Sequence, residues 1–230
     1  MARIARVVVP DIPHHITQRG NRSQKVFFSD ADRKAYLEIL SQTTQQHNVR
    51  IIAYCLMSNH VHLVAIPSDE TGLALGIGKT HKAYTRMVNF REGWRGYLWQ
   101  GRFSSFPLHT SYLFAAIRYV EMNPVRAGIV SRPEEYQWSS SAFHILGEQS
   151  KLISDHEDII PGKDLKYFLQ DGNADRDTDT FRKLSRTGRP LGDNDFVNNL
   201  EKITGKILRP RRAGRKKISI VSPEKHEVLY

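Results

Sequence analysis

Hydrophobic positions along this chain occur in short continuous runs or at helical spacing, and the runs predict four β-strands. The strands are expected at residues 13–18, 49–57, 60–66 and 97–106. Only Ser58 and Asn59 separate the second run from the third, which suits a hairpin turn or a bulge. The polar residues 19–22 predict a turn after the first strand.

Apolar residues at helical spacing predict three helices. The first is expected from about 30 to 47, because Ser29 and Asp32 resemble a capping box at its start. The third should span residues 112–123 and end there, because Pro124 disfavours helical geometry in the residue before it. The second helix has its apolar positions at Leu73, Ile77, Thr80, Tyr84 and Met87.

This order of elements predicts an α+β fold: a ferredoxin-like antiparallel sheet with helices packed on one face. Beyond about residue 150 the chain becomes polar, with a probable loop at 171–177, a short helix near 196–203 and a basic tract at 209–217. We therefore expect one domain over residues 1–150. Residues 151–230 would form an accessory C-terminal extension, mostly helical or irregular, with a basic tail.

The formal net charge of +10 predicts a polyanionic partner. Nucleic acid is favoured over a membrane surface, because no strongly amphipathic basic helix with a large apolar face is evident. No apolar run approaches the roughly 18 residues of a membrane span, and no secretory signal is evident. The single cysteine, Cys55, excludes an internal disulfide. We expect a cytoplasmic protein, associated with the nucleoid when bound to DNA.

His60 and His62 are the first candidates for chemistry. In a strand they project from the same side, about 6.5 Å apart along the backbone, so their imidazoles can converge on one metal ion. The alternate residues Val61, Leu63 and Ala65 would pack on helices and leave the histidine face open to solvent and substrate. A pair of hydrogen-bonded surface histidines is the alternative.

Tyr119 and Asn123 stand at positions i and i+4 and would share one helical face. An amide oxygen beside two imidazoles suits Mg²⁺ or Mn²⁺ better than a structural zinc ion. A tyrosine nucleophile carries a cost, since only about one phenol in a thousand is ionised at pH 7, and a divalent ion offsets much of it. The alternative is a tyrosine buried in a helix core with Asn123 as a cap.

Four ordered motifs make these candidates more specific. They are residues 13–21 (PHHITQRGN), 57–64 (MSNHVHLV), 99–103 (WQGRF) and 118–128 (RYVEMNPVRAG), extended by 136–140 (YQWSS). Together they resemble the signatures of the REP-associated tyrosine transposases, in the insertion-sequence-200-like branch of the HUH single-strand nucleases.

The resemblance implies a metal-dependent single-strand DNA endonuclease and strand transferase. His60 and His62 would bind Mg²⁺ or Mn²⁺, with Asn123 as third ligand. Tyr119 would attack a DNA phosphate, giving a 5′-phosphotyrosine and a free 3′-hydroxyl. The implied substrate is single-stranded DNA whose short palindrome folds as a hairpin, and the enzyme would act as a monomer or homodimer. The alternative is a catalytically silent, domesticated protein that binds hairpin DNA or represses transcription.

Basic and aromatic residues supply the candidate DNA contacts, because aromatic rings stack on unpaired bases while cations follow the backbone. They are Arg19, Asn21 and Arg22 in the first turn, Lys79, Lys82 and Arg86 on the second helix, Trp99 and Arg102 on the fourth strand, and Arg211, Arg212 and Arg215 in the tail. The alternatives are an ordinary solvated face for the second helix, core packing for Trp99 and a solvated tail.

Overall fold

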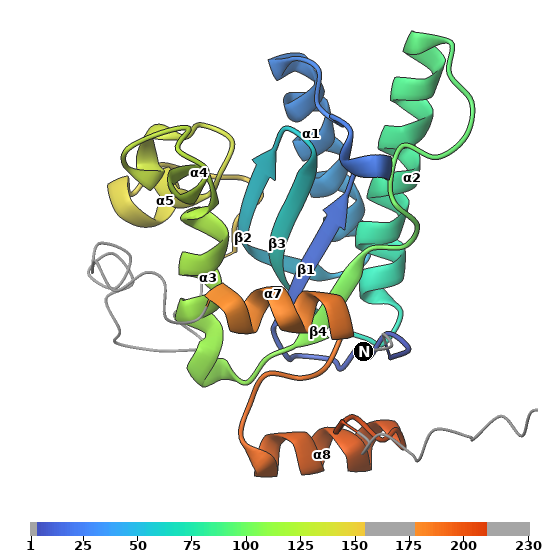
Figure 1. Cartoon of the computed structure of the whole chain (residues 1–230), viewed down its shortest axis with the longest axis vertical. Helices are drawn as coiled ribbons and strands as arrows, with labels where there is room; N and C mark the ends of the chain where they lie inside the picture. Colours follow the sequence, from blue (N-terminus) through green and yellow to red (C-terminus); the bar gives the residue numbers. More distant parts are fainter. Residues whose placement is uncertain (1–3, 155–177, 211–230) are drawn as a thin grey trace, which may run out of the picture.

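A four-stranded antiparallel sheet forms the centre of the molecule in the computed structural model, which describes residues 4–154 and 178–210 (Figure 1). The strand order β2-β3-β1-β4 and the helices packed on the sheet confirm the predicted α+β class. The strands are β1 (His14–Arg19), β2 (Val49–Met57), β3 (His60–Pro67) and β4 (Ser104–Pro107).

The hairpin between β2 and β3 closes as the sequence predicts. Met57 pairs with His60, so Ser58 and Asn59 form the two-residue turn. On its other side β3 pairs with β1, where His62 lies opposite Thr17. The two histidines are therefore on a central strand, where neighbouring strands hold the backbone on both sides.

The fourth strand is shorter than predicted, and residues 97–103 lie outside it. Only residues 104–107 pair with β1. Gly101 has a φ of +71°, and Trp99 meets the sheet only through an isolated bridge to Gly20. The Gln18 side chain donates to the Gly101 carbonyl at 2.9 Å, which holds this irregular segment against the end of β1. The left-handed backbone at Gly101 is incompatible with a continuous strand.

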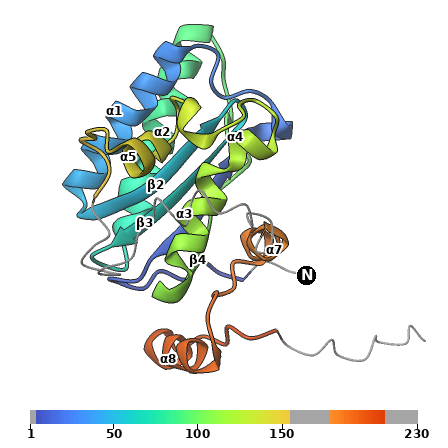
Figure 2. The ribbon, with the colours of Figure 1, turned by 90° about the vertical axis from the view of Figure 1, so that its left-hand side faces the viewer.

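Helices α1 (Asp30–Gln46) and α2 (Gly72–Glu92) pack against one face of the sheet (Figure 2). The predicted capping box is present, since the Ser29 and Asp32 side chains each bond the backbone N–H of the other residue. The buried Asp32 carboxylate also pairs with Arg91 near the end of α2, so one side chain joins the two helices.

Helix α3 (Leu113–Glu121) crosses the other face of the sheet, and α4 (Asn123–Arg126) follows almost at once. The predicted helix thus ends two residues early, and Pro124 lies in the first turn of α4, where a missing N–H costs nothing. The expectation of helices on one face holds for α1 and α2 only. The remaining short elements are α5 (Ser141–Leu146) and the 3₁₀ turns Asn21–Ser23, Thr110–Tyr112 and Pro133–Glu135.

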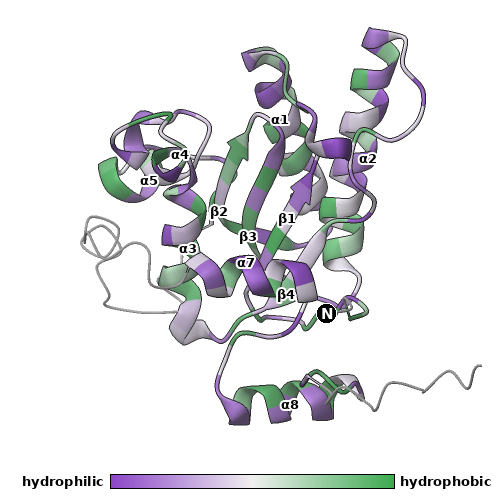
Figure 3. Ribbon diagram, viewed as in Figure 1, coloured by the Kyte–Doolittle hydropathy of each residue, from purple (hydrophilic) through white to green (hydrophobic). Residues whose placement is uncertain are grey.

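Two helices of the C-terminal region are described. The sequence did not predict α7 (Thr178–Thr187), which contacts β4, β1 and α3. The predicted short helix is α8 (Asn194–Thr204), along which hydrophobic and hydrophilic residues alternate (Figure 3). Its Phe196 and Leu200 form a small second core with Val7 and Val9. The predicted loop at 171–177 and the tail residues Arg211, Arg212 and Arg215 lie outside the described residues.

In the described ranges, no helix combines the length and the apolar character that crossing a membrane requires.

Candidate active site

Tyr119 lies beside the histidine pair, although about sixty residues separate them in the chain. The ring centroids of His60 and His62 are 5.0 Å apart, and the centroid of Tyr119 is 5.6 Å from that of His62. A third imidazole, His15 of β1, is 5.4 Å from Tyr119. These rings meet because α3 lies over the face of the sheet to which the histidines point.

Hydrogen bonds orient both imidazoles of the pair. The Nδ1 atom of His60 lies 2.6 Å from Oδ1 of Asn59, and because an amide oxygen only accepts, Nδ1 carries the proton. His62 Nδ1 is 3.2 Å from Nε2 of His15. The Nε2 atom of each ring in the pair is then left to bind a metal ion, with Asn59 and His15 as the supporting partners.

Both imidazoles are neutral near pH 7. Burial, assisted by the Arg19 charge, lowers the pKa of His60 to about 4. Burial, assisted by His60, His15 and nearby arginines, holds the pKa of His62 well below its ordinary value. Neutral imidazoles have the lone pair that metal binding needs.

Asn123 has the capping role that its position in the sequence suggested, and its amide oxygen takes no part in that cap. Its Nδ2 donates to the Tyr119 carbonyl at 2.8 Å and to the Val120 carbonyl at 3.2 Å, so it caps the end of α3. With the amide nitrogen so engaged, Oδ1 is the atom that can face a cation. Over residues 4–154 and 178–210, no three His, Cys, Asp or Glu side chains gather as a metal site. Two imidazoles and an amide oxygen nonetheless fit Mn²⁺ or Mg²⁺.

A pocket of about 760 Å³ joins these groups, since His60, His62, Tyr119 and Asn123 all line it. None of the described residues that line it is acidic, so the pocket favours an anion. Five of them are arginines: Arg19, Arg102, Arg126, Arg182 and Arg186.

Two opposing effects act on the Tyr119 phenol. Burial raises its pKa above the ordinary value, while the charges of Arg126, Arg182 and Arg19 and a hydrogen bond with Arg182 lower it. The Arg126 guanidinium lies 4.8 Å from the Tyr119 ring centroid and donates to the Tyr119 carbonyl. Burial is the larger effect, so the hydroxyl is protonated near pH 7.

Helix α7 packs on Tyr119 and His15 and so narrows access to the histidine face, which the sequence led us to expect open to solvent. The Phe181 ring is stacked on Tyr119 at 4.8 Å with an interplanar angle of 12°, and Ser185 Oγ is 3.4 Å from His15 Nδ1. Tyr119 is consequently 7% exposed and His62 6% exposed. The expectation therefore holds only in part, because His62 is nearly buried whereas His60 is partly exposed, and both rings line the pocket.

Sequence reasoning missed three side chains around Tyr119, namely Arg126, Phe181 and Arg182. Arg126 lies inside the quoted motif 118–128, three residues beyond Asn123. For α7 a signal exists: Phe181 and Leu184 are apolar at i and i+3, and Gly188 with a φ of +73° follows the helix end. The short length and polar surroundings of the segment hid this signal.

The predicted DNA contacts fall into separate places. Arg19 and Arg102 line the active-site pocket, whereas Asn21 and Arg22 lie in the adjoining 3₁₀ turn and do not line it. Trp99 is 5% exposed and its indole N–H donates to the His81 carbonyl, so it packs in the core. A second hollow beside α2 is lined by Lys79, Lys82, Arg86, Trp99 and Arg102.

Comparisons with known proteins place the chain in a family. The family model described as "Transposase IS200 like" matches residues 8–123, just over half of the chain. The chain therefore belongs to the family of IS200-like transposases, as the motifs predicted. Among curated proteins the comparison finds no match.

Two solved structures are similar. One shows a REP-associated tyrosine transposase bound to a REP hairpin; the match has 15% identity, covers 67% of this chain and 92% of that one, and has a TM-score of 0.52. This likeness supports the fold. The other is a putative transposase from Deinococcus radiodurans R1, with 16% identity, coverage of 56% and 92%, and a TM-score of 0.37.

Proposed function

We propose that this IS200-like transposase is a metal-dependent single-strand DNA endonuclease and strand transferase that acts at hairpin-forming palindromic repeats. One observation carries the proposal: Tyr119, the His60 and His62 imidazoles and Asn123 all line one arginine-rich pocket. A phosphodiester is the substrate that this combination of nucleophile, metal ligands and cations suits.

In the proposed reaction the Tyr119 oxygen attacks the phosphorus atom of a DNA phosphodiester. The new O–P bond forms as the P–O3′ bond breaks, the phenol gives up its proton, and the 3′-oxygen takes up a proton and leaves as a hydroxyl. The product is a 5′-phosphotyrosine, whose bond energy supports transfer to another 3′-hydroxyl without ATP. A divalent cation held by His60, His62 and Asn123 would polarise the phosphate and neutralise developing charge.

The arginines have two tasks in this proposal. Arg126 and Arg182 favour the phenolate of Tyr119, which opposes the effect of burial on its pKa. Arg19 and Arg102, which line the same pocket, would bind flanking phosphates and hold the strand in line for attack. We propose Mn²⁺ or Mg²⁺ as the metal ion and a monomer or homodimer as the active form.

A covalent adduct tests the proposal. Hairpin-bearing single-stranded DNA with a fluorophore at its 3′ end is incubated with the protein and Mn²⁺ and analysed on a denaturing gel. A labelled protein band should form in the wild type and in Tyr97→Phe, and be absent in Tyr119→Phe and with chelator. The 5′-labelled oligonucleotide should give only a shortened free strand.

Two outcomes contradict the proposal. An adduct that persists in Tyr119→Phe, or one that carries the 5′ label, would assign the chemistry to another nucleophile or another polarity. A mobility shift with hairpin DNA but no adduct under any metal condition would favour the catalytically silent hairpin-binding protein.

A further inference from the structure

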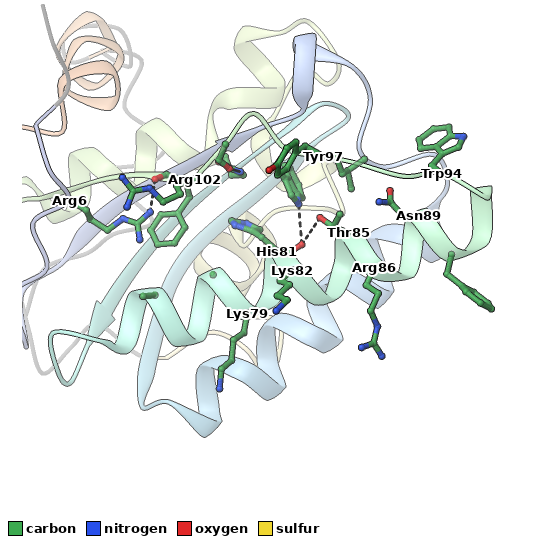
Figure 4. Close-up of a pocket in the computed structure, with 18 residues that line it drawn as sticks. Arg6, Lys79, His81, Lys82, Thr85, Arg86, Asn89, Trp94, Tyr97 and Arg102 are labelled. Carbon is green, nitrogen blue, oxygen red and sulfur yellow. Dashed lines mark hydrogen bonds between the residues drawn. The ribbon is translucent and has the colours of Figure 1, made fainter.

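A second hollow, of about 1000 Å³, runs between α2 and the irregular segment 94–103 (Figure 4). We call it the α2 groove. It belongs to the opposite side of the sheet from Tyr119, because α2 packs on the face that α3 does not cover. The proposed cleavage chemistry therefore does not account for it.

Exposed aromatic rings line the α2 groove. Phe90 is 90% exposed, Tyr97 84% and Trp94 45%. Phe90 and Tyr97 are largely unburied, whereas Trp94 also packs edge-on against Phe28. Three exposed rings at one hollow form a surface patch suited to a partner. Figure 4 shows Trp94 and Tyr97 on the segment that faces α2.

Cations accompany these rings. Lys79, Lys82 and Arg86 stand at i, i+3 and i+7 and follow one side of α2, and Arg102 lies at the other end of the hollow. None of the described residues that line the groove is an aspartate or glutamate. Flat apolar rings among unopposed positive charges match a polyanion that carries exposed aromatic faces.

The α2 groove adjoins the active-site pocket. Gln18 and Arg102 line both hollows. Gln18 holds the Gly101 carbonyl and thereby fixes the irregular segment at the edge of β1, where the two hollows meet. A strand bound with one phosphate at Tyr119 can pass Arg102 and enter the groove.

We propose that the α2 groove binds unpaired nucleotides of single-stranded DNA that flank the hairpin, with bases stacked on Tyr97 and Trp94 and phosphates at Lys82 and Arg86. This inference rests on the proposed function for its substrate. Unpaired DNA fits better than duplex, because the faces of paired bases are already stacked on each other and cannot reach an aromatic side chain.

Binding measured in chelator, where no cleavage occurs, tests the groove separately from the chemistry. Three ligands share one hairpin: the hairpin alone, the hairpin with an unpaired DNA flank of about eight nucleotides on the 5′ or the 3′ side, and the hairpin with the same flank made double-stranded. Wild-type protein should bind one of the unpaired flanks about tenfold or more tightly than the hairpin alone.

Variants of the α2 groove then test whether the added affinity for the unpaired flank arises there. Tyr97→Ala and Trp94→Ala should each reduce the gain from the unpaired flank by about fivefold or more, up to its complete loss, and leave affinity for the hairpin alone unchanged. Tyr97→Phe should retain it, because the ring remains. Lys82→Ala should weaken flank binding, whereas Lys34→Ala, which removes an exposed lysine on α1 away from both hollows, should not.

Several results would overturn the inference. They are a flank that adds no affinity in the wild type, a gain that survives both alanine variants, a double-stranded flank that binds better than the unpaired one, and a wild-type dimer that Tyr97→Ala converts to monomers. The adduct assay on the same variants separates the two proposals, since a groove variant that still forms adduct on the hairpin keeps the chemistry intact. If the wild type shows the flank effect, the groove variants lose it and the wild type forms no adduct, the groove proposal stands and only the cleavage reaction is refuted.

Discussion

His14 and His15 are adjacent in β1 and equally buried, yet their side chains point to opposite faces of the sheet. The hydrogen bonds of His14 in the described residues are to the backbone, at Val7, Val9 and Ile12, whereas His15 contacts His62 and Tyr119. Substitutions at these two positions can therefore distinguish a residue that supports the candidate metal ligands from one that only stabilises the fold. The sequence motif contains both residues and does not distinguish them.

His15→Phe should weaken Mn²⁺ binding by about 10- to 100-fold, because His62 loses the partner that orients its ring. His14→Phe, the matched control, should lower stability without this loss of metal affinity. Titration calorimetry with Mn²⁺ alone measures the metal affinity of both variants. Equal Mn²⁺ affinity in the two variants would show that His15 has no supporting role.

His81 provides a pH dependence away from the site. It is buried on α2, 3.0 Å from the Tyr36 hydroxyl, and burial lowers its pKa to about 3. Because its folded-state pKa lies below the unfolded value of 6.5, the unfolded chain binds the extra proton first, and stability falls as the pH drops from about 6.5 towards 3.

The His81 imidazole should account for about 2 kcal/mol of lost unfolding free energy between pH 7 and pH 5. In His81→Gln, urea unfolding at the two pH values should show a correspondingly smaller loss. The remaining loss includes His14 and His15, whose pKa values burial also lowers. If wild type and His81→Gln lose the same unfolding free energy between pH 7 and pH 5, His81 is not kept neutral in the folded protein.

At the scale of elements, the predictions succeed where local pattern decides and fail where long-range contact decides. The β2–β3 hairpin and the start of α1 follow from Ser58–Asn59 and from the Ser29 capping box, which are interactions between near neighbours. The start of β4 depends on Gly101 adopting a positive φ against Gln18, and nothing local requires that. Helix α7 gains its stability from packing on Tyr119 and Phe106, which its own sequence does not reveal.

Phe181→Ala should undock α7 from the sheet, because it removes a fully buried ring that is worth about 3 kcal/mol. Hydrogen exchange should accelerate over residues 178–187 and remain slow in β1 and β3. The Tyr119 pKa should move down towards 10, since burial is what raises it. NMR of labelled tyrosine measures that shift, and Leu146→Ala, at an exposed position on α5, should leave both readouts unchanged.

At the scale of the whole molecule, the structure shows where the positive charge gathers, which composition alone does not reveal. The net charge of +10 predicts a polyanionic partner, and the structure concentrates five arginines at the Tyr119 pocket. Arg182 and Arg186 reach this pocket from α7, so the region after residue 150 contributes to the candidate site.

The affinity for single-stranded DNA should fall linearly on a log–log plot against salt, with a slope of about −0.7 for each phosphate neutralised. Arg182→Ala should reduce the magnitude of that slope by about one such unit. Lys34→Ala, an exposed lysine outside both hollows, should leave it unchanged. Identical slopes in wild type and Arg182→Ala would remove α7 from the DNA interface.

The sequence by itself determined the α+β class, the two-residue hairpin and the family, because strand alternation, turn chemistry and short motifs are properties of neighbouring residues. It also selected Tyr119, His60, His62 and Asn123 as the candidate site residues. Only the tertiary structure decided what surrounds them. The contacts of His15, Arg126 and Phe181 with Tyr119, and the aromatic rings of the α2 groove, depend on packing between segments far apart in the chain. Local sequence pattern does not show which distant surfaces pack together, and that packing sets the burial and the charge around the Tyr119 phenol.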